Sequence, residues 1–305
     1  ALVGRAWTAK PIGKDRVVVP ALASYLGAHG TATDSCLKVD RCELAAVMGK
    51  SSEKRGVLTI FSQNIRSMSK NFDKLYDLIQ EVNKESKTNF LFLVLAIQET
   101  WQVKEVFDMP HYQKFISKTR TRGIAGGGIG FFVREGCEYE VLNEPSIYEE
   151  RVHESLFIRV KGKNGGVVIG NVYRPNTAPY ANINKSTQHL SRSIDYVRRN
   201  FRNDSIVIVG DFNVDLLGED DKESLGLVSE ISSQGFIELI TVPTREASSS
   251  KTLLDHIWIK SLFKNTAGLV SSEISDHFST FLSLEHELKH VEKAKQFLKR
   301  NTNDL

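Results

Sequence analysis

Polar side chains with catalytic potential follow a series of apolar runs along this chain. Each run is typical of a β-strand, and each ends on an acid, an amide, a phenol or an imidazole. Any one of these residues alone is most often a turn residue. Six such ends in one chain favour a common cleft in which the side chains converge. The residues at these ends are Asn64, Glu99, Tyr173, Asp211 with Asn213, Asp255, and the pair Asp276 and His277.

The clearest of these ends is the stretch of residues 206–213. Four apolar residues, mostly β-branched, predict a buried strand, and Gly210 then lets the backbone turn. In an extended segment, positions i and i+2 point to the same side, so Asp211 and Asn213 are expected to share one face at the mouth of a sheet. One is an acceptor and the other a donor, which suits a reaction that orients a water and holds an anionic oxygen.

Together, these residue types fit metal-assisted hydrolysis of a phosphate ester. A hard cation such as Mg²⁺ takes oxygen ligands, usually one or two carboxylates with waters and substrate oxygens. Amide and phenol donors can hold the charge that develops on phosphoryl oxygens. A carboxylate beside an imidazole can orient the ring and keep it protonated.

Hydrophobic patterns indicate which elements must position these residues. Mostly β segments with helices interspersed predict two packed sheets flanked by helices. Helical spacing is found at residues 70–84, 181–201 and 221–234. Strands are expected at residues 57–61, 90–97, 154–160, 167–172, 206–209, 236–240, 253–259 and 278–284. The glycine run at residues 126–130 fits neither a dinucleotide nor a P-loop spacing, and it predicts a tight turn with close strand approach.

Composition narrows the possible partners and compartments. The chain has 305 residues, of which 41% are hydrophobic, so it can bury a sizeable core. Its net charge of +3 permits a polyanionic partner without demanding one. Cys36, Cys42 and Cys137 are odd in number and lack metal-ligand spacing, which predicts a reducing, intracellular compartment. No apolar run is long enough for a transmembrane helix, so no membrane partner is expected.

One motif suggests a different chemistry. Residues 286–290 read His-Glu-Leu-Lys-His, the helix motif of zinc proteases. No further His follows in residues 291–305 to supply a third protein ligand, and their one Glu, Glu292, comes directly after the motif rather than well downstream of it. The segment is better interpreted as a charged, solvated C-terminal helix.

With their neighbours, the polar strand ends resemble the ordered motif set of the endonuclease/exonuclease/phosphatase superfamily. The resemblance covers about residues 57–285. Finer details are similar to the endonuclease domain of non-LTR (LINE-type) retrotransposons: Gln-Glu-Thr-Trp at 98–101, Tyr-Arg-Pro at 173–175, Pro-Thr-Arg at 243–245 and Thr-Leu-Leu-Asp-His-Ile at 252–257. The motifs shared with the superfamily are Ser62-Gln63-Asn64, Gln98-Glu99-Thr100, Val172-Tyr173-Arg174-Pro175, Gly210-Asp211-Phe212-Asn213, Leu254-Asp255-His256-Ile257 and Ser275-Asp276-His277.

The resemblance implies a four-layer α/β sandwich of the DNase I type and a Mg²⁺- or Mn²⁺-dependent endonuclease that nicks DNA. Duplex DNA is the expected partner and the nucleus the expected compartment. The domain would span residues 56–285, after an N-terminal extension (1–55) and before a charged C-terminal helix or linker (286–305). No Tyr-x-Asp-Asp polymerase motif is present, so the reverse transcriptase of a full-length element is a candidate partner, and the chain could be a truncated element, a domesticated copy or an excised domain. The alternatives are a phosphatase or phosphodiesterase acting on a small molecule or lipid, and an inactive nucleic-acid-binding scaffold.

The resemblance also implies roles for the acidic and amide residues. Glu99 would be the main metal ligand, with Asn64 and Asp276 nearby. Asp211 would orient or deprotonate the attacking water. Asn213 would contact the scissile phosphate.

Further roles concern the phosphoryl group and the substrate. Tyr173 would donate to a phosphate oxygen. His277, steered by Asp255, would act on the phosphoryl group as base or electrophile. Thr244 and Thr252 match hydroxyl positions of the retrotransposon type.

Three arginines are candidates for phosphate contact, because a guanidinium offers a planar fork of donors. They are Arg174, Arg120 and Arg122; for the last two, a solvated loop is an equally good interpretation. Trp101 and Trp258 are interpreted as packing residues, and His256 as a residue that fills its strand.

Overall fold

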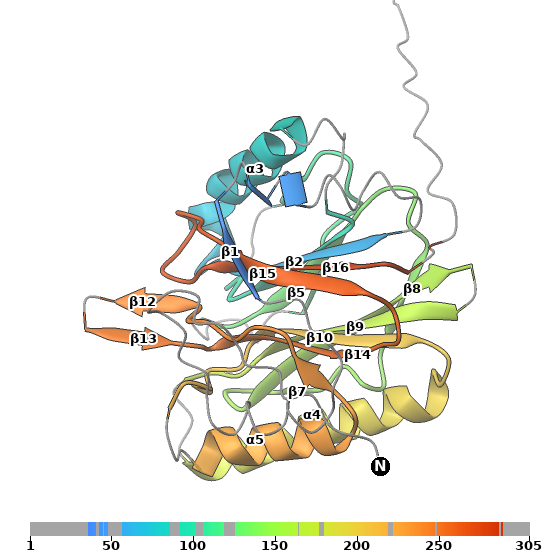
Figure 1. Cartoon of the computed structure of the whole chain (residues 1–305), viewed down its shortest axis with the longest axis vertical. Coiled ribbons are helices and arrows are strands. Elements are labelled where there is room, and N and C mark those ends of the chain that lie inside the picture. Colours follow the sequence, from blue (N-terminus) through green and yellow to red (C-terminus); the bar gives the residue numbers. More distant parts are fainter. Residues whose placement is uncertain are drawn as a thin grey trace, which may run out of the picture.

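The computed structural model places two β-sheets face to face between layers of helix (Figure 1). The structure describes residues 36–40, 43–44, 46–47, 57–85, 92–101, 106–118, 126–163, 165–176, 180–218, 222–247, 249–286 and 288. Arg120 and Arg122 therefore lie outside the described residues.

The first sheet is mixed, and its central strands β2 and β3 run parallel. Both strands are buried on both faces, which explains the nearly continuous apolar sequence of β3. In spatial order the strands are β1 (Leu37–Val39), β15 (Asn265–Val270), β16 (Ser279–Leu284), β2 (Leu58–Asn64), β3 (Val94–Gln98), β5 (Ile129–Val133) and β4 (Ile116–Lys118).

The second sheet is centred on the predicted strand at 206–209, now β10 (Ser205–Asp211). This strand runs parallel to β9 (Gly165–Tyr173) and antiparallel to β14 (Asp255–Lys260). The remaining strands are β11 (Ile237–Glu238) beside β14, then β8 (His153–Gly162) and β6 (Tyr139–Leu142) beyond β9, with β7 (Tyr148–Glu149) also paired to β8. A separate hairpin of β12 (Arg245–Ala247) and β13 (Ser250–Thr252) projects from the sandwich (Figure 1).

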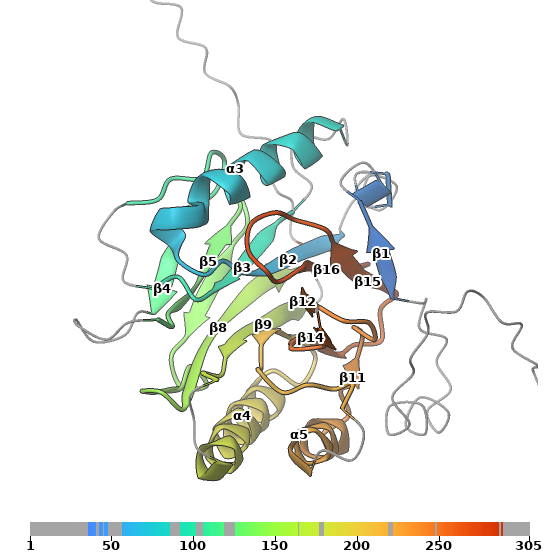
Figure 2. The same cartoon turned by 90° about the vertical axis from the view of Figure 1, so that its left-hand side faces the viewer.

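Helices cover the outer faces of both sheets. Helix α3 (Met68–Glu85) lies on the first sheet, whereas α4 (Tyr180–Asn200) and α5 (Lys222–Ser233) lie together on the second (Figure 2). The apolar face of α3, including Leu75 and Ile79, packs with Phe61 and Phe132 of the first sheet. The architecture is therefore the expected four-layer α/β sandwich.

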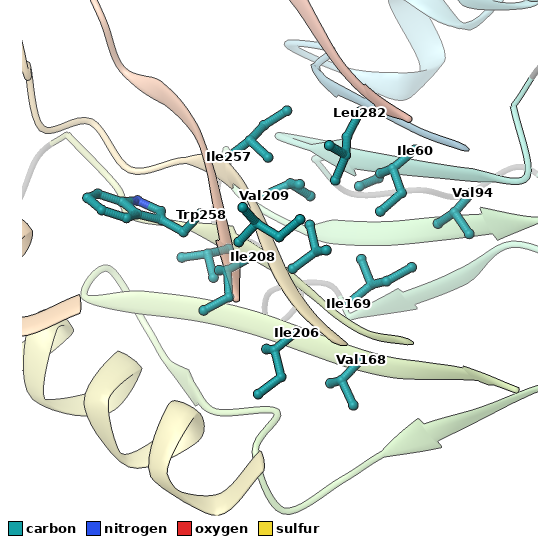
Figure 3. Close-up of a cluster of buried hydrophobic side chains, with 14 of the residues drawn as sticks. Ile60, Val94, Val168, Ile169, Ile206, Ile208, Val209, Ile257, Trp258 and Leu282 are labelled. Atoms are coloured by element: carbon teal, nitrogen blue, oxygen red, sulfur yellow. The ribbon is translucent and has the colours of Figure 1, made fainter. Parts of the chain in front are cut away.

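The main core lies between the two sheets. Ile60, Val94 and Leu282 of the first sheet face Val209 and Ile257 of the second (Figure 3). In β10 these inward residues alternate with Ile206 and Ile208, which lie on the helix side together with the fully buried Trp258. Trp258 is thus a packing residue, as predicted.

Two short segments outside residues 56–285 pair with strands of the sandwich. β1 precedes residue 56, yet it pairs in parallel with β15 and extends the first sheet. With three residues, β1 is too short to show a hydrophobic period. After β16, Leu288 forms an antiparallel bridge with Gly162, so the segment starts extended. Residues 289–305 lie outside the described part, and the C-terminal helix stays a prediction.

None of the described helices has the length and apolar character that a membrane span requires.

Candidate active site

The predicted polar side chains meet at one end of the sandwich, where the Asn64 amide is one of the links between the two sheets. Not all of them end a strand, because Asp255 opens β14 and His277 precedes β16. Asn64 closes β2 of the first sheet, and Asp211 closes β10 of the second. The Asn64 Nδ2 atom donates to Oδ2 of Asp211 at 2.8 Å and to Oε1 of Glu99 at 2.9 Å. Asn64 is fully buried, and its amide holds the buried Asp211 carboxylate and the half-buried Glu99 carboxylate in place.

Asp211 and Asn213 lie together, but for a different reason from the one predicted. Asn213 has a φ of 48°, so the chain after β10 is not extended. This left-handed turn, which asparagine tolerates better than most residues, folds the Asn213 side chain back onto the carboxylate. Its backbone N–H donates to Oδ1 of Asp211 at 2.9 Å, and its Nδ2 donates to Oδ2 at 3.1 Å. The pairing was predicted correctly, but from the wrong geometry.

The Asp211 carboxyl holds its proton to an unusually high pH. Burial raises its pKa and the neighbouring Asp255 carboxylate adds to the rise, bringing it to about 7. His277 and the donors from Asn64 and Asn213 oppose this shift. Near neutral pH, the group can therefore both accept and release a proton.

His277 and Asp255 form a buried pair beside Asp211. The Nδ1 atom of His277 lies 2.8 Å from Oδ2 of Asp255, and both residues are almost fully buried. Burial alone would lower the pKa of His277, but Asp255, Asp211 and Asp276 outweigh it and raise the pKa to about 9. The ring is therefore an imidazolium at neutral pH.

Gly210 allows the close approach of β9 and β10 behind these residues. Its φ is +137°, and a Cβ atom there would lie 1.9 Å from the carbonyl oxygen of Val172. Gly210 is therefore needed because the two strands lie too close for a side chain, whereas the sequence suggested that it allows a turn. This register sets Tyr173 directly opposite Asp211, with Tyr173 largely buried.

Glu99 follows β3 and reaches the site through a left-handed backbone, with a φ of 50°. Its Oε2 accepts the indole N–H of Trp101 at 3.2 Å, and its Oε1 accepts the Asn64 amide. Trp101 is 41% exposed, so its interpretation as a packing residue is wrong. A left-handed backbone at Trp101 turns the ring out beside Glu99, which a hydrophobic pattern cannot reveal.

Asp276 also reaches this end of the sandwich, but both of its oxygens are already paired. Oδ1 accepts from Arg66 and Oδ2 from Arg245, each at 2.8 Å. Although burial opposes it, the charges of His277, Arg66 and Arg245 hold the pKa of Asp276 below its usual range. Its role as a metal ligand stays a prediction.

Two groups of side chains have donor atoms suited to a divalent cation. Glu99 and Asn64 offer a carboxylate and an amide oxygen, the donor types that Mg²⁺ and Mn²⁺ accept. No basic side chain in the described part of the chain pairs with Glu99, so its charge is available. The second group is Asp211, Asp255 and His277, whose ligand atoms lie within 4.8 Å of one another. This second group already includes one positive charge, because the His277 ring is protonated at neutral pH.

The predicted substrate contacts lie deeper than expected. Arg174 is 7% exposed, and its Nε donates to the carbonyl of Phe212 at 2.7 Å. A second guanidinium nitrogen bonds the carbonyl of Asn213. Arg174 therefore braces the turn that carries Asn213.

Thr244 likewise serves the protein itself. Its hydroxyl accepts the backbone N–H groups of Leu254 and Asp255, each at 3.0 Å, and so fixes the start of β14. Thr252 is half-buried in the hairpin, where it pairs with Arg245. His256 is buried, stacks on Phe212 and fills its strand as interpreted.

A buried polar network beneath the site was missed. Gln63 donates to Oγ of Ser275 at 3.1 Å and to the carbonyl of His277 at 3.4 Å. Its Oε1 accepts the hydroxyls of Ser272 and Ser279. This network ties β2 to the segment before His277. Gln63 and Ser275 belong to the motifs quoted above, but no role was inferred for either of them from the sequence.

Comparison with known proteins agrees with this geometry. The Endonuclease/Exonuclease/phosphatase family model matches residues 61–277. The endonuclease domain of TRAS1, a telomere-specific non-LTR retrotransposon, superposes with a TM-score of 0.58 at 14% identity, covering 75% of this chain and 99% of that chain. None of the curated protein sequences compared matches significantly.

Two other solved structures have the same fold. The APE2 catalytic domain of Xenopus laevis has a TM-score of 0.56 at 14% identity, covering 76% of this chain and 94% of that one. A mannosyl-6-phosphatase of Bacteroides thetaiotaomicron VPI-5482 has a TM-score of 0.54 at 17% identity, covering 74% and 99%. Since the family model spans more than half of the chain and includes every strand end described above, the chain belongs to the endonuclease/exonuclease/phosphatase family.

Proposed function

We propose that the chain is a Mg²⁺- or Mn²⁺-dependent endonuclease that nicks DNA, as in target-site cleavage by a non-LTR retrotransposon. The observation that carries this proposal is the Asn64 amide, which holds Glu99 and Asp211 beside the His277–Asp255 pair. This places an available carboxylate, a base and a cation within one site. The proposed partners are duplex DNA and, in a full-length element, a reverse transcriptase.

Different residues have different roles in the in-line attack of water on a phosphodiester. Asp211, whose pKa of about 7 suits a base near neutral pH, orients the water and takes its proton. His277 presents its protonated ring to the phosphoryl oxygens and stabilises the charge that develops there. Tyr173 adds a neutral donor. Both N–H groups of the Asn213 amide are already bonded, to Asp211 and to the carbonyl of Arg174, so Asn213 would contact the phosphate by exchanging one of these bonds. The cationic state of His277 favours the electrophile role over the base role.

A divalent cation fits beside Glu99 and Asn64. When bound, it would supply Lewis-acid charge to the phosphate group. Asn64 would then connect the metal side of the site to Asp211.

A plasmid assay tests this proposal. Supercoiled DNA should be nicked with Mg²⁺ or Mn²⁺, remain intact in excess EDTA, and carry 3′-hydroxyl ends that a polymerase can extend. His277→Ala should abolish most nicking. His111→Asn should retain it, because His111 is exposed and its φ of 70° suits asparagine.

Two other outcomes of these assays would contradict the nuclease proposal. Release of inorganic phosphate from a sugar phosphate without any nicking would replace the nuclease proposal by a phosphomonoesterase. DNA binding without hydrolysis under any metal condition would indicate a scaffold instead.

A further inference from the structure

Two arginines from distant parts of the chain are held side by side at the edge of the site. Arg66 follows β2, and Arg245 opens β12 of the projecting hairpin. Each donates to a different oxygen of Asp276 at 2.8 Å. The trio carries a net charge of +1, so Asp276 orients the two guanidiniums without neutralising both.

The backbone fixes both arginines relative to the catalytic residues. The Arg66 N–H donates to Oδ1 of Asn64 at 3.1 Å, and the Arg66 backbone is left-handed with a φ of 47°. Arg245 forms an antiparallel backbone bridge with His277. Both guanidiniums therefore have defined positions, one beside the Asn64 side of the site and the other beside His277.

The two guanidiniums lie at the rim, whereas the catalytic groups lie deep. The side chains of Arg66 and Arg245 are 46% and 34% exposed, against 4% for His277. Each guanidinium has five N–H donors, and among the described residues only one donor of each is bonded, to Asp276. The remaining donors can engage an anion bidentately, the geometry in which arginine binds phosphate.

We propose that Arg66 and Arg245 form a binding site for a second phosphate of the substrate, the phosphodiester adjacent to the one that is cut. This inference rests on the proposed function and deepens it. A substrate with a single phosphate would leave the arginine pair empty, whereas a polynucleotide would fill it. The pair thus selects nucleic acid over phosphomonoesters and isolated diesters, and Asp276 acts as its positioning residue.

Kinetics on two substrates of different length tests the pair. The short substrate is the p-nitrophenyl ester of thymidine 5′-phosphate, which has one phosphodiester. The long substrate is a DNA duplex of about 20 base pairs with one labelled end. The variants are Arg66→Gln and Arg245→Gln, which keep a hydrogen-bond donor for Asp276 but remove the charge. Arg199→Gln is the matched control, since Arg199 is an exposed, ion-paired arginine on α4.

Arg66→Gln and Arg245→Gln should each raise KM for the duplex about tenfold. Each should also reduce the slope of the logarithm of the binding constant against the logarithm of salt concentration by about one. The kcat/KM of each variant for the short ester should stay within about twofold of the unchanged chain. Arg199→Gln should match the unchanged chain on both substrates. An equal loss on both substrates would overturn the proposal, because the arginines would then only support His277. Unchanged kinetics on the duplex would also overturn it.

Binding without catalysis separates this inference from the proposed function. In EDTA, fluorescence anisotropy of a labelled duplex reports binding alone. If the chain hydrolyses no diester with any metal, yet binds DNA with an affinity that falls in both variants, the endonuclease proposal fails and the phosphate site stands. If it nicks DNA and the variants bind as tightly as the unchanged chain, only the phosphate site fails.

Discussion

Replacing Asp255 by Asn should remove the charge that keeps His277 protonated. The two side chains are 2.8 Å apart, and both are almost fully buried, so solvent screens their attraction little. Asn has the same shape as Asp and can still accept a hydrogen bond. The substitution therefore changes mainly the charge beside the ring.

The size of the effect follows from the pKa of His277. Its rise from 6.5 to about 9 corresponds to about 3 kcal/mol in favour of the imidazolium, at 1.36 kcal/mol per unit. Because the folded-state pKa exceeds the unfolded one, this contribution to stability is fully present below pH 6.5 and is lost as the pH rises through about 9. Without the Asp255 charge, only Asp211 and Asp276 oppose the effect of burial, and the pKa of His277 should fall.

Histidine NMR in EDTA measures this pKa directly. The His277 resonance is assigned by its absence in His277→Ala, and its shift is followed from pH 5 to 10. His153 is an internal control, because burial lowers its pKa to about 3 and it should stay neutral in both proteins. A His277 pKa near 6.5 in the unchanged chain would refute the reasoning, as would an unchanged value in Asp255→Asn.

Two further predictions concern the support of the site. Gly210→Ala should lower the free energy of unfolding in urea by at least about 3 kcal/mol, because the φ of +137° is strained and the new Cβ would meet Val172. Gly226→Ala is the control, because Gly226 lies in α5 with open space around it, and it should raise the free energy of unfolding by about 0.5–1 kcal/mol. The same change in both variants would contradict the argument that Gly210 is needed for contact between β9 and β10. Mg²⁺ binding at Glu99 should disturb the hydrogen bond from the Trp101 indole to Glu99 and so change the tryptophan fluorescence. The same fluorescence change in Trp101→Phe would show that the cation binds elsewhere.

The fold could be predicted from the sequence because buried positions make apolar residues recur at regular spacing along most helices and strands. Apolar runs marked β2, β3 and β10, and helical spacing marked α3 to within about two residues at each end. β1 gave no such signal, since three residues at the edge of a sheet cannot establish a pattern. Its place depends on pairing with β15, more than 220 residues later in the chain.

The sequence predicted that several polar side chains would come together, but not how they are arranged. Polar residues next to apolar runs indicated that Asn64, Asp211 and His277 would meet, and they do, although His277 precedes β16 instead of ending a strand. Sequence could not show that Asn213 reaches Asp211 through a left-handed turn. Nor could it show that Arg174 turns inward to a carbonyl, since that depends on a loop nearly 40 residues away.

The arginine pair illustrates the same limit. Arg66 and Arg245 are separated from Asp276 by 210 and 31 residues, and no local pattern connects them. Only the pairing of β2 with β16 and the placement of the hairpin bring the three together. Contacts of this kind follow from topology rather than from composition or period.

The most direct test of the site is a Mg²⁺ titration of the nicking rate in Glu99→Gln, His277→Ala, Asp255→Asn and the Asp255→Asn/His277→Ala double variant. If Glu99 holds the cation, Glu99→Gln should need more Mg²⁺ and recover part of its rate at high concentration. His277→Ala should lose on the order of 10²–10⁴ in turnover at every concentration, because the missing group is not a ligand. Asp255→Asn should lose less, and the double variant should lose little more than His277→Ala, because the pair acts as a unit. Rescue of His277→Ala by Mg²⁺, or a double variant that loses the full product of both effects, would contradict the assignment of these roles.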